Sequence, residues 1–408
     1  MNASTRSFRL SRTRYHGTDV DGARLRPERL EVRGRDLNDL IGRLSFEQAL
    51  WHLWFGAAAT APEHLAVRVR LAQLASGFMQ PNPTVTAGQA AAAAGTAPIF
   101  AVAAGLLRGV DEVRQRSVSP TGPCSPTWDD DFDTLLACVA AVPALLRATL
   151  ESADPGSVDC PGAGPARQAP CDDPPAFSHG VLHAAGATGA DPLAAARVMD
   201  ALLVGWHAGF GYLTPTVLVT RCAIGTGVDL AHAVAAGCLA SGPSHVGAAF
   251  DSMRWLAGIG RNRTAPPLAC EPALSDADAC QVIDRAFDGA AGRLAGFGHP
   301  LFEVDPRPPR LRELWRAWSF EGPAIRWYDA ACRRAAQRKG LQPNIDFITA
   351  AALLDLGVAD PHWAVGVGLC ARVAAMATHA VERRRRPAFG QNHRTARAQL
   401  NALPTGWL

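Results

Sequence analysis

The sequence predicts a mainly α-helical protein, and three observations support this class. Helix-forming residues dominate the 408 positions, and apolar side chains recur at spacings of three and four residues in many segments. Start signals such as Asp or Ser and stop signals such as Gly or Pro bracket these segments. Alternating strand patterns are scarce apart from residues 29–33, where Leu30 and Val32 alternate with charged residues.

Four segments of the N-terminal half are expected to be largely helical, at residues 39–55, 65–78, 84–107 and 133–150, and all but the third show helical apolar spacing. Ser45 and Gln48 form a capping-box pattern inside the first segment, so we expect a helix to restart there. The third segment carries no charge, but Ala, Gly and Thr dominate it, which favours buried helix and turn over a membrane span. Pro143 is expected to kink or end the fourth segment.

Capping signals and apolar spacing predict further helices at residues 191–207, 229–240, 246–256, 276–294, 324–339, 347–356 and 364–383. Asp191 and Asp229 are the expected N-caps of the first two. Two stretches rich in Pro, Gly, Ser or Asp, residues 117–128 and 154–175, are interpreted as loop insertions.

Composition restricts the classes of partner. The hydrophobic content of 48% allows a large core, and the net charge of +3 comes without a basic stripe interleaved with aromatic residues. Nucleic acid is therefore not the expected partner. The ten cysteines form no C-x-x-C and no zinc-like spacing with His, so we expect free thiols in a reducing cytoplasm and no metal site.

Three tight polar turns interrupt the helical stretches, at residues 242–247, 296–299 and 343–347. They contribute His245, His299 and Asp346, and two imidazoles with one carboxylate suit acid–base chemistry on a carbon skeleton. A neutral His can donate a hydrogen bond to an oxygen that gains charge, and a carboxylate can remove a proton from carbon. Each residue also has an ordinary explanation, because His245 could cap a helix, His299 could belong to a plain turn and Asp346 could be an N-cap.

Three arginines are candidate carboxylate ligands, because a guanidinium group matches a carboxylate bidentately. They are Arg307, Arg372 and Arg386. Arg372 lies in a largely apolar run, where an unpaired charge would be costly. Arg386 ends a run of four arginines, and such a run is usually a solvated helix end.

Together these motifs resemble the citrate synthase family, which includes methylcitrate synthases and citryl-CoA lyase-like proteins. Residues 33–47 resemble its N-terminal signature, residues 242–247 and 296–307 its two histidine motifs, and residues 343–347 its aspartate motif. Arg372 and Arg386 match its two C-terminal arginine sites. The order and spacing of the motifs agree over most of the chain.

The resemblance implies a two-domain helical fold in a homodimer. The large domain would comprise residues 1–245 and 356–408, and the inserted small domain residues 246–355. It also implies an acyltransferase of the citrate synthase type. Asp346 would take a proton from an acyl-CoA thioester, His245 would stabilise the enolate oxygen, and His299 would hydrogen-bond the ketone of a 2-oxo acid such as oxaloacetate.

By the same resemblance, Arg307 and Arg372 would hold the carboxylates of the 2-oxo acid, and Arg386 would reach in from the partner subunit. Hydrolysis of the thioester would then release CoA. Coenzyme A is thus expected as a substrate, with no tightly bound cofactor, and neither nucleic acid nor a membrane is an expected partner.

The chain also departs from the family pattern. Many members carry another His where this chain has Gly211, and His207 is the expected substitute. A cation that many members place after the second histidine is absent around Glu303, and Arg338 and Lys339 are expected to compensate near the CoA phosphates. Two alternatives stay open: cleavage of the citryl-CoA lyase type, and a catalytically impaired dimeric homologue with a binding role.

Overall fold

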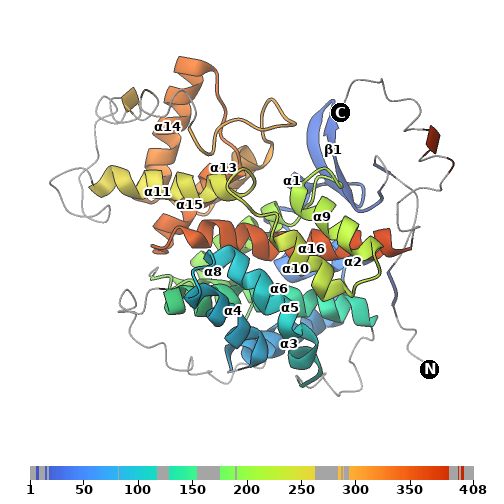
Figure 1. The fold of residues 1–408 in the computed structure, drawn as a ribbon. Helices are drawn as coiled ribbons and strands as arrows, with labels where there is room; N and C mark the ends of the chain where they lie inside the picture. Colours follow the sequence, from blue (N-terminus) through green and yellow to red (C-terminus); the bar gives the residue numbers. More distant parts are fainter. Residues whose placement is uncertain are drawn as a thin grey trace.

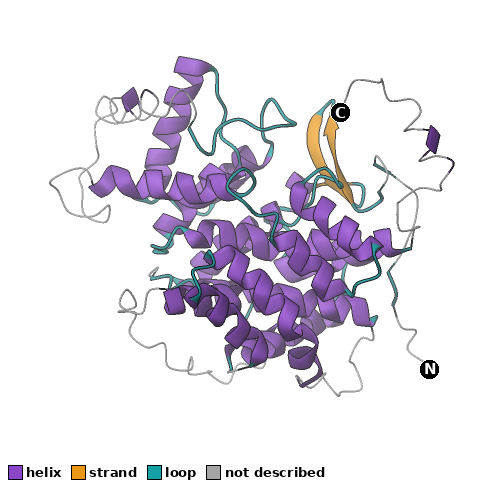
Figure 2. Cartoon of the chain, in the orientation of Figure 1, coloured by secondary structure: helices purple, strands orange, loops and turns teal. Residues whose placement is uncertain are grey.

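The computed structural model confirms the mainly helical class (Figure 1, Figure 2). It describes residues 6–8, 14–15, 18–80, 82–116, 128–153, 175–188, 191–261, 284–285, 288, 294–385, 394 and 397–398. The two predicted insertions lie almost wholly outside these residues, as does most of the predicted helix 276–294.

A small antiparallel sheet begins the described fold, with strand order β1-β2-β3. Its strands are β1 (Asp21–Leu25), β2 (Glu28–Val32) and β3 (Arg35–Asp36). β2 confirms the alternation seen at residues 29–33. The register pairs the first residue of β1, Asp21, with the last residue of β2, Val32, and this places the start of β1 in the core.

The helices of the N-terminal half are α1 (Leu37–Leu40), α2 (Phe46–Phe55), α3 (Ala61–Met79), α4 (Pro83–Ala93), α5 (Pro98–Arg116), α6 (Asp130–Ala153), α7 (Phe177–Ala184) and α8 (Pro192–Trp206). The predicted restart is confirmed, because Ser45 and Gln48 form a complete capping box at the start of α2. Pro143 does not end its helix, since α6 continues past it for ten residues, to Ala153.

The later helices are α9 (Pro215–Gly225), α10 (Leu230–Cys238), α11 (Gly247–Arg261), α13 (Arg307–Ala317), α14 (Pro323–Lys339), α15 (Ile345–Asp355) and α16 (His362–Arg384). Asp191 and Asp229 accept backbone N–H groups at the starts of α8 and α10, as predicted. Gly340 ends α14 with a φ of 64°, a conformation that favours glycine.

Helix α16 runs through the middle of the molecule and contacts α6, α8, α9, α10 and α11 (Figure 1). α6 and α16 are long and apolar enough to cross a membrane by length and composition alone. Inside the fold, however, 83% and 100% of their apolar windows are buried. Packing against other helices therefore accounts for their apolar character.

Helix α15 lies where two groups of helices meet. It packs against α11, α13 and α14 on one side and against α8 and α16 on the other. Its N-terminus therefore lies close to both groups, which is where a site formed by both can be built. The division into domains near residues 245 and 356 stays a prediction.

Candidate active site

The second histidine turn and the aspartate turn are joined by backbone hydrogen bonds. The N–H of Gly298 donates to the carbonyl oxygen of Gln342 at 2.8 Å, and the N–H of Asn344 donates to that of Gly296 at 2.9 Å. Gly296 has a φ of 83°, and a Cβ there would lie 2.6 Å from a side chain of α15. Only glycine fits this approach, so the two turns are held side by side.

Asp346 lies in the first turn of α15, and the expectation that it caps the helix is wrong. Asn344 is the N-cap, and its side chain accepts the N–H of Asp346 at 3.0 Å. The carboxylate of Asp346 is therefore not the cap of the helix, and its Oδ1 is buried without a hydrogen-bond partner in the described structure. Burial raises the pKa of Asp346 to about 7, the charge of Arg307 opposes this, and the charge of Asp305 adds to it.

His299 is fixed in one tautomer by its own turn. Its Nδ1 lies 3.1 Å from the N–H of Leu301 and 3.2 Å from the N–H of Phe302, so Nδ1 accepts and carries no proton. Burial lowers the pKa of His299 to about 4, and the charge of Arg307 lowers it further. The ring is therefore neutral at physiological pH, and its proton sits on Nε2, which can donate to a ligand.

His245 is also neutral and also has an unused ring nitrogen. Its backbone N–H donates to the carbonyl oxygen of Gly242, and Val246 next to it has a φ of 68°, which is rare for a β-branched residue. Nε2 is buried and has no hydrogen-bond partner among the described residues. Burial lowers the pKa of His245 to about 4, with a further contribution from the charge of Arg372.

The two predicted arginines are both buried, with exposed fractions of 2% for Arg307 and 4% for Arg372. Arg307 donates from Nε and Nη2 to the two oxygens of Asp305 at 2.9 and 2.8 Å, and its Nη1 is buried without a partner in the described structure. Arg372 donates from Nη1 to the carbonyl oxygen of Ala208. Within the described ranges Arg372 forms no ion pair with a carboxylate.

Both guanidinium groups lie on the same two aromatic rings. Arg307 is 4.8 Å from the ring centre of Phe210 and 5.8 Å from that of Trp206, and Arg372 is 5.7 and 5.9 Å from them. Burial, and then the charge of Arg307, lower the pKa of Arg372 to about 9. Arg307 and Arg372 are thus two neighbouring buried cations, and together they have a single carboxylate partner, Asp305. Such an excess of positive charge makes a binding site for an anion.

Phe210, which lies against both arginines, is also 5.3 Å from the ring of His299, and Asp305 joins Arg307 to the start of α15. The charge of Arg372 also acts on the pKa values of His245, His299 and Asp346. The structure therefore brings five of the predicted residues together in one site: His245, His299, Asp346, Arg307 and Arg372. Two neutral donors and one carboxylate thus share the neighbourhood of two buried cations.

His207 is placed differently. It is the C-cap of α8 and fully buried, and its Nδ1 lies 2.6 Å from the carbonyl oxygen of Val204. Nδ1 therefore carries the proton, and Nε2 is an acceptor with no partner in the described structure. Burial lowers the pKa of His207 to about 4. A neutral ring of this tautomer offers a carboxylate no proton, so the tautomer does not support the predicted substrate contact.

The remaining predicted residues lie at the C-terminal end of α14 or outside the described chain. Arg338, in the last turn of α14, pairs with Asp284 at 3.2 Å and with Asp288 at 2.5 Å. Lys339 follows it at the exposed end of that helix. Arg386 lies outside the described residues.

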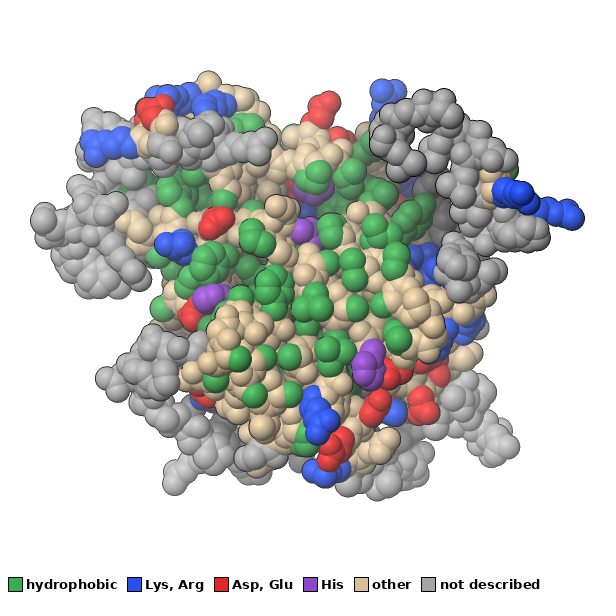
Figure 3. Space-filling view, viewed as in Figure 1, with side chains coloured by type: hydrophobic (Ala, Val, Ile, Leu, Met, Phe, Trp, Pro, Cys, Tyr) green, Lys and Arg blue, Asp and Glu red, His purple; other side chains and the backbone are tan. Residues whose placement is uncertain are grey.

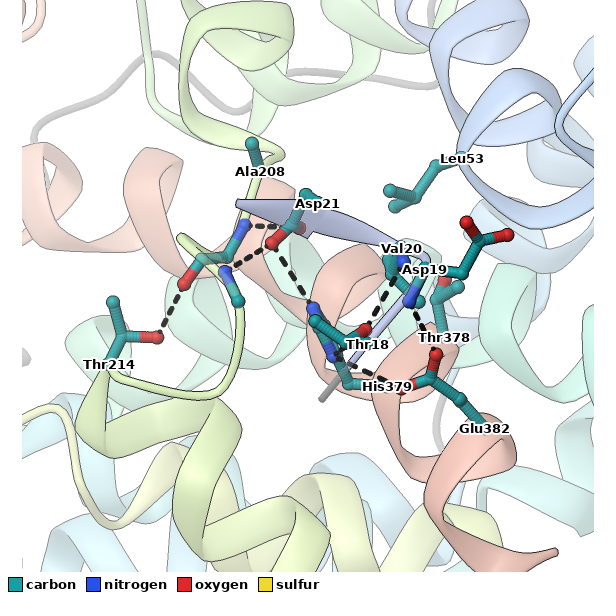
Figure 4. Close-up of polar contacts among 12 residues, drawn as sticks. Thr18, Asp19, Val20, Asp21, Leu53, Ala208, Thr214, Thr378, His379 and Glu382 are labelled. Carbon is teal, nitrogen blue, oxygen red and sulfur yellow. Dashed lines mark hydrogen bonds and ion pairs between the residues drawn. The ribbon is translucent and has the colours of Figure 1, made fainter. Parts of the chain in front are cut away.

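Sequence reasoning missed the residues that support the site, and Asp21 is the clearest case. Figure 4 shows its carboxylate at the start of β1, turned toward the loop after α8 and toward α16. Its Oδ2 accepts the N–H of Gly209 at 2.7 Å, and its Oδ1 accepts the N–H of Gly211 at 2.5 Å and contacts Nε2 of His379 at 3.2 Å. Between the two glycines lies Phe210, with a φ of 60°. Asp21 thus holds the loop whose ring supports both arginines.

Thr18, His379 and Asp21 in this network are the residue types of a nucleophilic catalytic triad, but they are not accessible to a substrate. The hydroxyl of Thr18 lies 3.4 Å from Nδ1 of His379, whose other nitrogen faces Asp21. All three side chains are fully buried, so no substrate can reach them. Glu382 pairs with Arg221 at 2.8 Å beside them, which makes the cluster an anchor between β1, α9 and α16.

Comparison with known proteins identifies the family and the fold of the chain. The family model described as "Citrate synthase, C-terminal domain" matches residues 10–395. The chain belongs to the citrate synthase family. Its fold is similar to that of citrate synthase from Pyrobaculum aerophilum, with a TM-score of 0.63 at 20% identity, covering 90% of this chain and 86% of that one.

A second citrate synthase structure, from Thermoplasma acidophilum, was solved as a ternary complex with carboxymethyl coenzyme A and oxaloacetate. It matches with a TM-score of 0.63 at 17% identity and covers 90% of this chain and 88% of that one. The citrate synthase of Haloferax volcanii is 30% identical over 122 residues. That match spans 29% of this chain and only 28% of the relative. The family model thus establishes the family, and the structural likenesses establish the fold.

Proposed function

We propose that this member of the citrate synthase family condenses an acyl-CoA, such as acetyl-CoA or propionyl-CoA, with a 2-oxo acid such as oxaloacetate. The observation that carries the proposal is the buried, unpartnered Oδ1 of Asp346 in a site with two neutral imidazoles and two buried arginines. A carboxylate whose pKa is near 7 suits proton abstraction at neutral pH, because a general base works best when its pKa is near the working pH.

In the first step, Asp346 removes a proton from the carbon next to the thioester carbonyl. The electron pair of that C–H bond forms the enolate, and the thioester oxygen gains negative charge. His245 donates a hydrogen bond to this oxygen from its free ring nitrogen. His245 is neutral, so it stabilises the charge through a hydrogen bond from its single ring N–H. Removal of a comparable donor costs about 3–4 kcal/mol of transition-state stabilisation.

In the second step, the enolate carbon attacks the ketone carbon of the 2-oxo acid, and a carbon–carbon bond forms. The electrons of the ketone move onto its oxygen, which receives a hydrogen bond from Nε2 of His299. The tautomer of His299 supports this role. The N–H groups of Leu301 and Phe302 donate to Nδ1, so the ring proton is on Nε2. Arg307 and Arg372 bind the carboxylates of the acid, and water then cleaves the thioester and releases CoA.

The substrate class rests on the anion site and on the relatives. Carboxymethyl coenzyme A and oxaloacetate in the Thermoplasma acidophilum complex are ligands of the classes proposed here. CoA is thus a substrate, and no tightly bound cofactor is proposed. Arg338 and Lys339, at the C-terminal end of α14, are proposed to contact its phosphates, although Arg338 already pairs with two carboxylates.

The protein is further proposed to work as a cytoplasmic homodimer. Apolar side chains gather on the face formed by α9 and α10 (Figure 3). The exposed ones there are Leu213, Leu218, Val219, Val228 and Leu239. An apolar surface of this kind suits an interface between two copies of the chain. Across it, Arg386 of one subunit would complete the anion site of the other.

The experiment is to mix the protein with oxaloacetate and either acetyl-CoA or propionyl-CoA and to follow thiol release. Asp346→Asn removes the base, and Asp355→Asn is the matched control, since Asp355 holds the start of α14 through Ala324 and Ile325. Release that is lost in the first variant only supports the condensing activity. Formation of acetyl-CoA and oxaloacetate from citryl-CoA, without thiol release in the forward direction, would assign the lyase activity instead.

A further inference from the structure

Asp305 is the most highly connected side chain of the site, and it has no role in the mechanism above. It lies in the loop before α13 and is 1% exposed. Its Oδ1 accepts the backbone N–H of Arg307 at 3.1 Å and Nε of the same residue at 2.9 Å. Its Oδ2 accepts Nη2 of Arg307 at 2.8 Å and the N–H of Ile345 at 3.0 Å. Both oxygens are thus fully used inside the protein.

These four bonds connect two parts of the site that are distant in sequence. Arg307 begins α13 and is the proposed carboxylate ligand, whereas Ile345 begins α15 and precedes the proposed base. Asp305 uses three of the bonds on Arg307 and turns Nη1 away from itself, where it has no partner in the described structure. The fourth bond holds the first N–H of α15.

On the basis of the proposed function, we infer that Asp305 is a positioning residue that fixes the substrate cation Arg307 and the base Asp346 relative to each other. The bidentate contact sets the plane of the guanidinium group, so that one edge is neutralised and the other is presented to the 2-oxo acid. The bond to Ile345 sets the start of α15, where Asp346 is the next residue. Asp305 itself touches neither substrate.

Charge gives this arrangement a measurable signature. The charged groups that act on Asp346 are Arg307 from α13, Asp305 from the preceding loop and Arg372 from α16. Asp305 raises the pKa of Asp346, and both arginines lower it. Replacement of Asp305 by Asn removes the negative charge and leaves Arg307 without its counter-ion. Both changes favour the ionised form of Asp346, so its pKa must fall.

The test compares Asp305→Asn with Asp355→Asn, a partly buried carboxylate that also holds a helix start, that of α14. The titration of Asp346 is followed by difference infrared spectroscopy, with Asp346→Asn to assign its band. We expect Asp305→Asn to lower the pH of half-ionisation and to raise KM for oxaloacetate at least tenfold, with a smaller loss of kcat. Asp355→Asn should change none of these.

An unchanged titration of Asp346 in a folded Asp305→Asn protein, or an equal change in Asp355→Asn, would overturn the inference. The titration needs no turnover, so it still decides if the wild-type protein releases no thiol and the proposed function fails. If Asp305→Asn does not fold, Arg307→Gln keeps the carboxylate and removes the cation. The pH of half-ionisation must then rise, and a fall or no change would equally refute the inference.

Discussion

Replacement of Arg372 by Met should stabilise the protein in the absence of ligand. Arg372 is 4% exposed, and burial together with the charge of Arg307 lowers its pKa to about 9, so the fold disfavours its charge. Since each pKa unit corresponds to about 1.4 kcal/mol, burying this charge costs the folded state on the order of 5 kcal/mol. Met is unbranched and fills a similar space without a charge.

Part of this gain is lost with the contacts of the guanidinium group. The variant leaves the carbonyl oxygen of Ala208 without its donor, which costs about 1–3 kcal/mol. It also removes the cation–π contacts with Trp206 and Phe210, worth about 0.5–2 kcal/mol. We therefore expect a net stabilisation of about 2 kcal/mol, similar to other replacements of buried charges by apolar side chains.

The variant should be more stable than the ligand-free wild type at every physiological pH. Because the charged form is the one penalised, the difference between variant and wild type is complete at any pH below about 9 and decreases above it. Saturating oxaloacetate reverses the order. At a hundredfold excess over its Kd, a ligand adds about 2.7 kcal/mol to the wild type, and it should add nothing to the variant.

Urea denaturation with and without oxaloacetate measures both effects. The matched control is Arg221→Met, because Arg221 is also buried but pairs with Glu382 at 2.8 Å. Breaking such a pair strands a buried carboxylate and destabilises a protein by about 3–5 kcal/mol. A variant of Arg372 that is less stable than the wild type by more than about 1 kcal/mol, or that still gains stability from oxaloacetate, would refute the reasoning.

Three further predictions concern the chemistry and the assembly. The rate of thiol release should fall as the pH drops below about 7. Asp346 must be ionised to act as a base, and burial raises its pKa to about that value. Stopped-flow pH profiles that are flat from pH 5 to 8 would contradict this. His299→Gln should lower kcat by about 100- to 1,000-fold. The pH profile should show no new ionisation between pH 5 and 8, since the imidazole of His299 is neutral throughout that range. A loss of kcat below tenfold would argue against the proposed role of His299. Leu218→Asp should convert the proposed dimer to a monomer in analytical ultracentrifugation, whereas Leu193→Asp, on the exposed side of α8, should not. Two dimeric variants would rule out the proposed interface.

Local signals in the sequence were enough to predict most helices. Ser45, Asp191 and Asp229 begin helices where predicted, because an N-cap bonds to N–H groups two or three residues away and needs nothing else. Asp346 shows the limit of the same rule. Asn344 and Asp346 are both favoured caps, and only the backbone geometry at residue 344 decides between them.

The supporting residues could not be predicted from local signals. The contact between Asp21 and the loop after α8 joins residues about 190 positions apart, and no pattern in the sequence of β1 predicts it. Asp305 is different, because it lies inside a motif that was recognised. The role proposed for it was missed because the motif suggests which residue binds substrate and not which one holds that residue in place.

The bond between Asp21 and His379 also sets the order in which the molecule can be completed during synthesis. These residues are 358 positions apart, and translation at about 5–20 residues per second separates their appearance by about 20–70 seconds. Throughout that interval the nascent N-terminal strand lacks the helix it must pack against. The strand therefore stays without its buried partner until α16 has been made, although it contains none of the groups proposed to react.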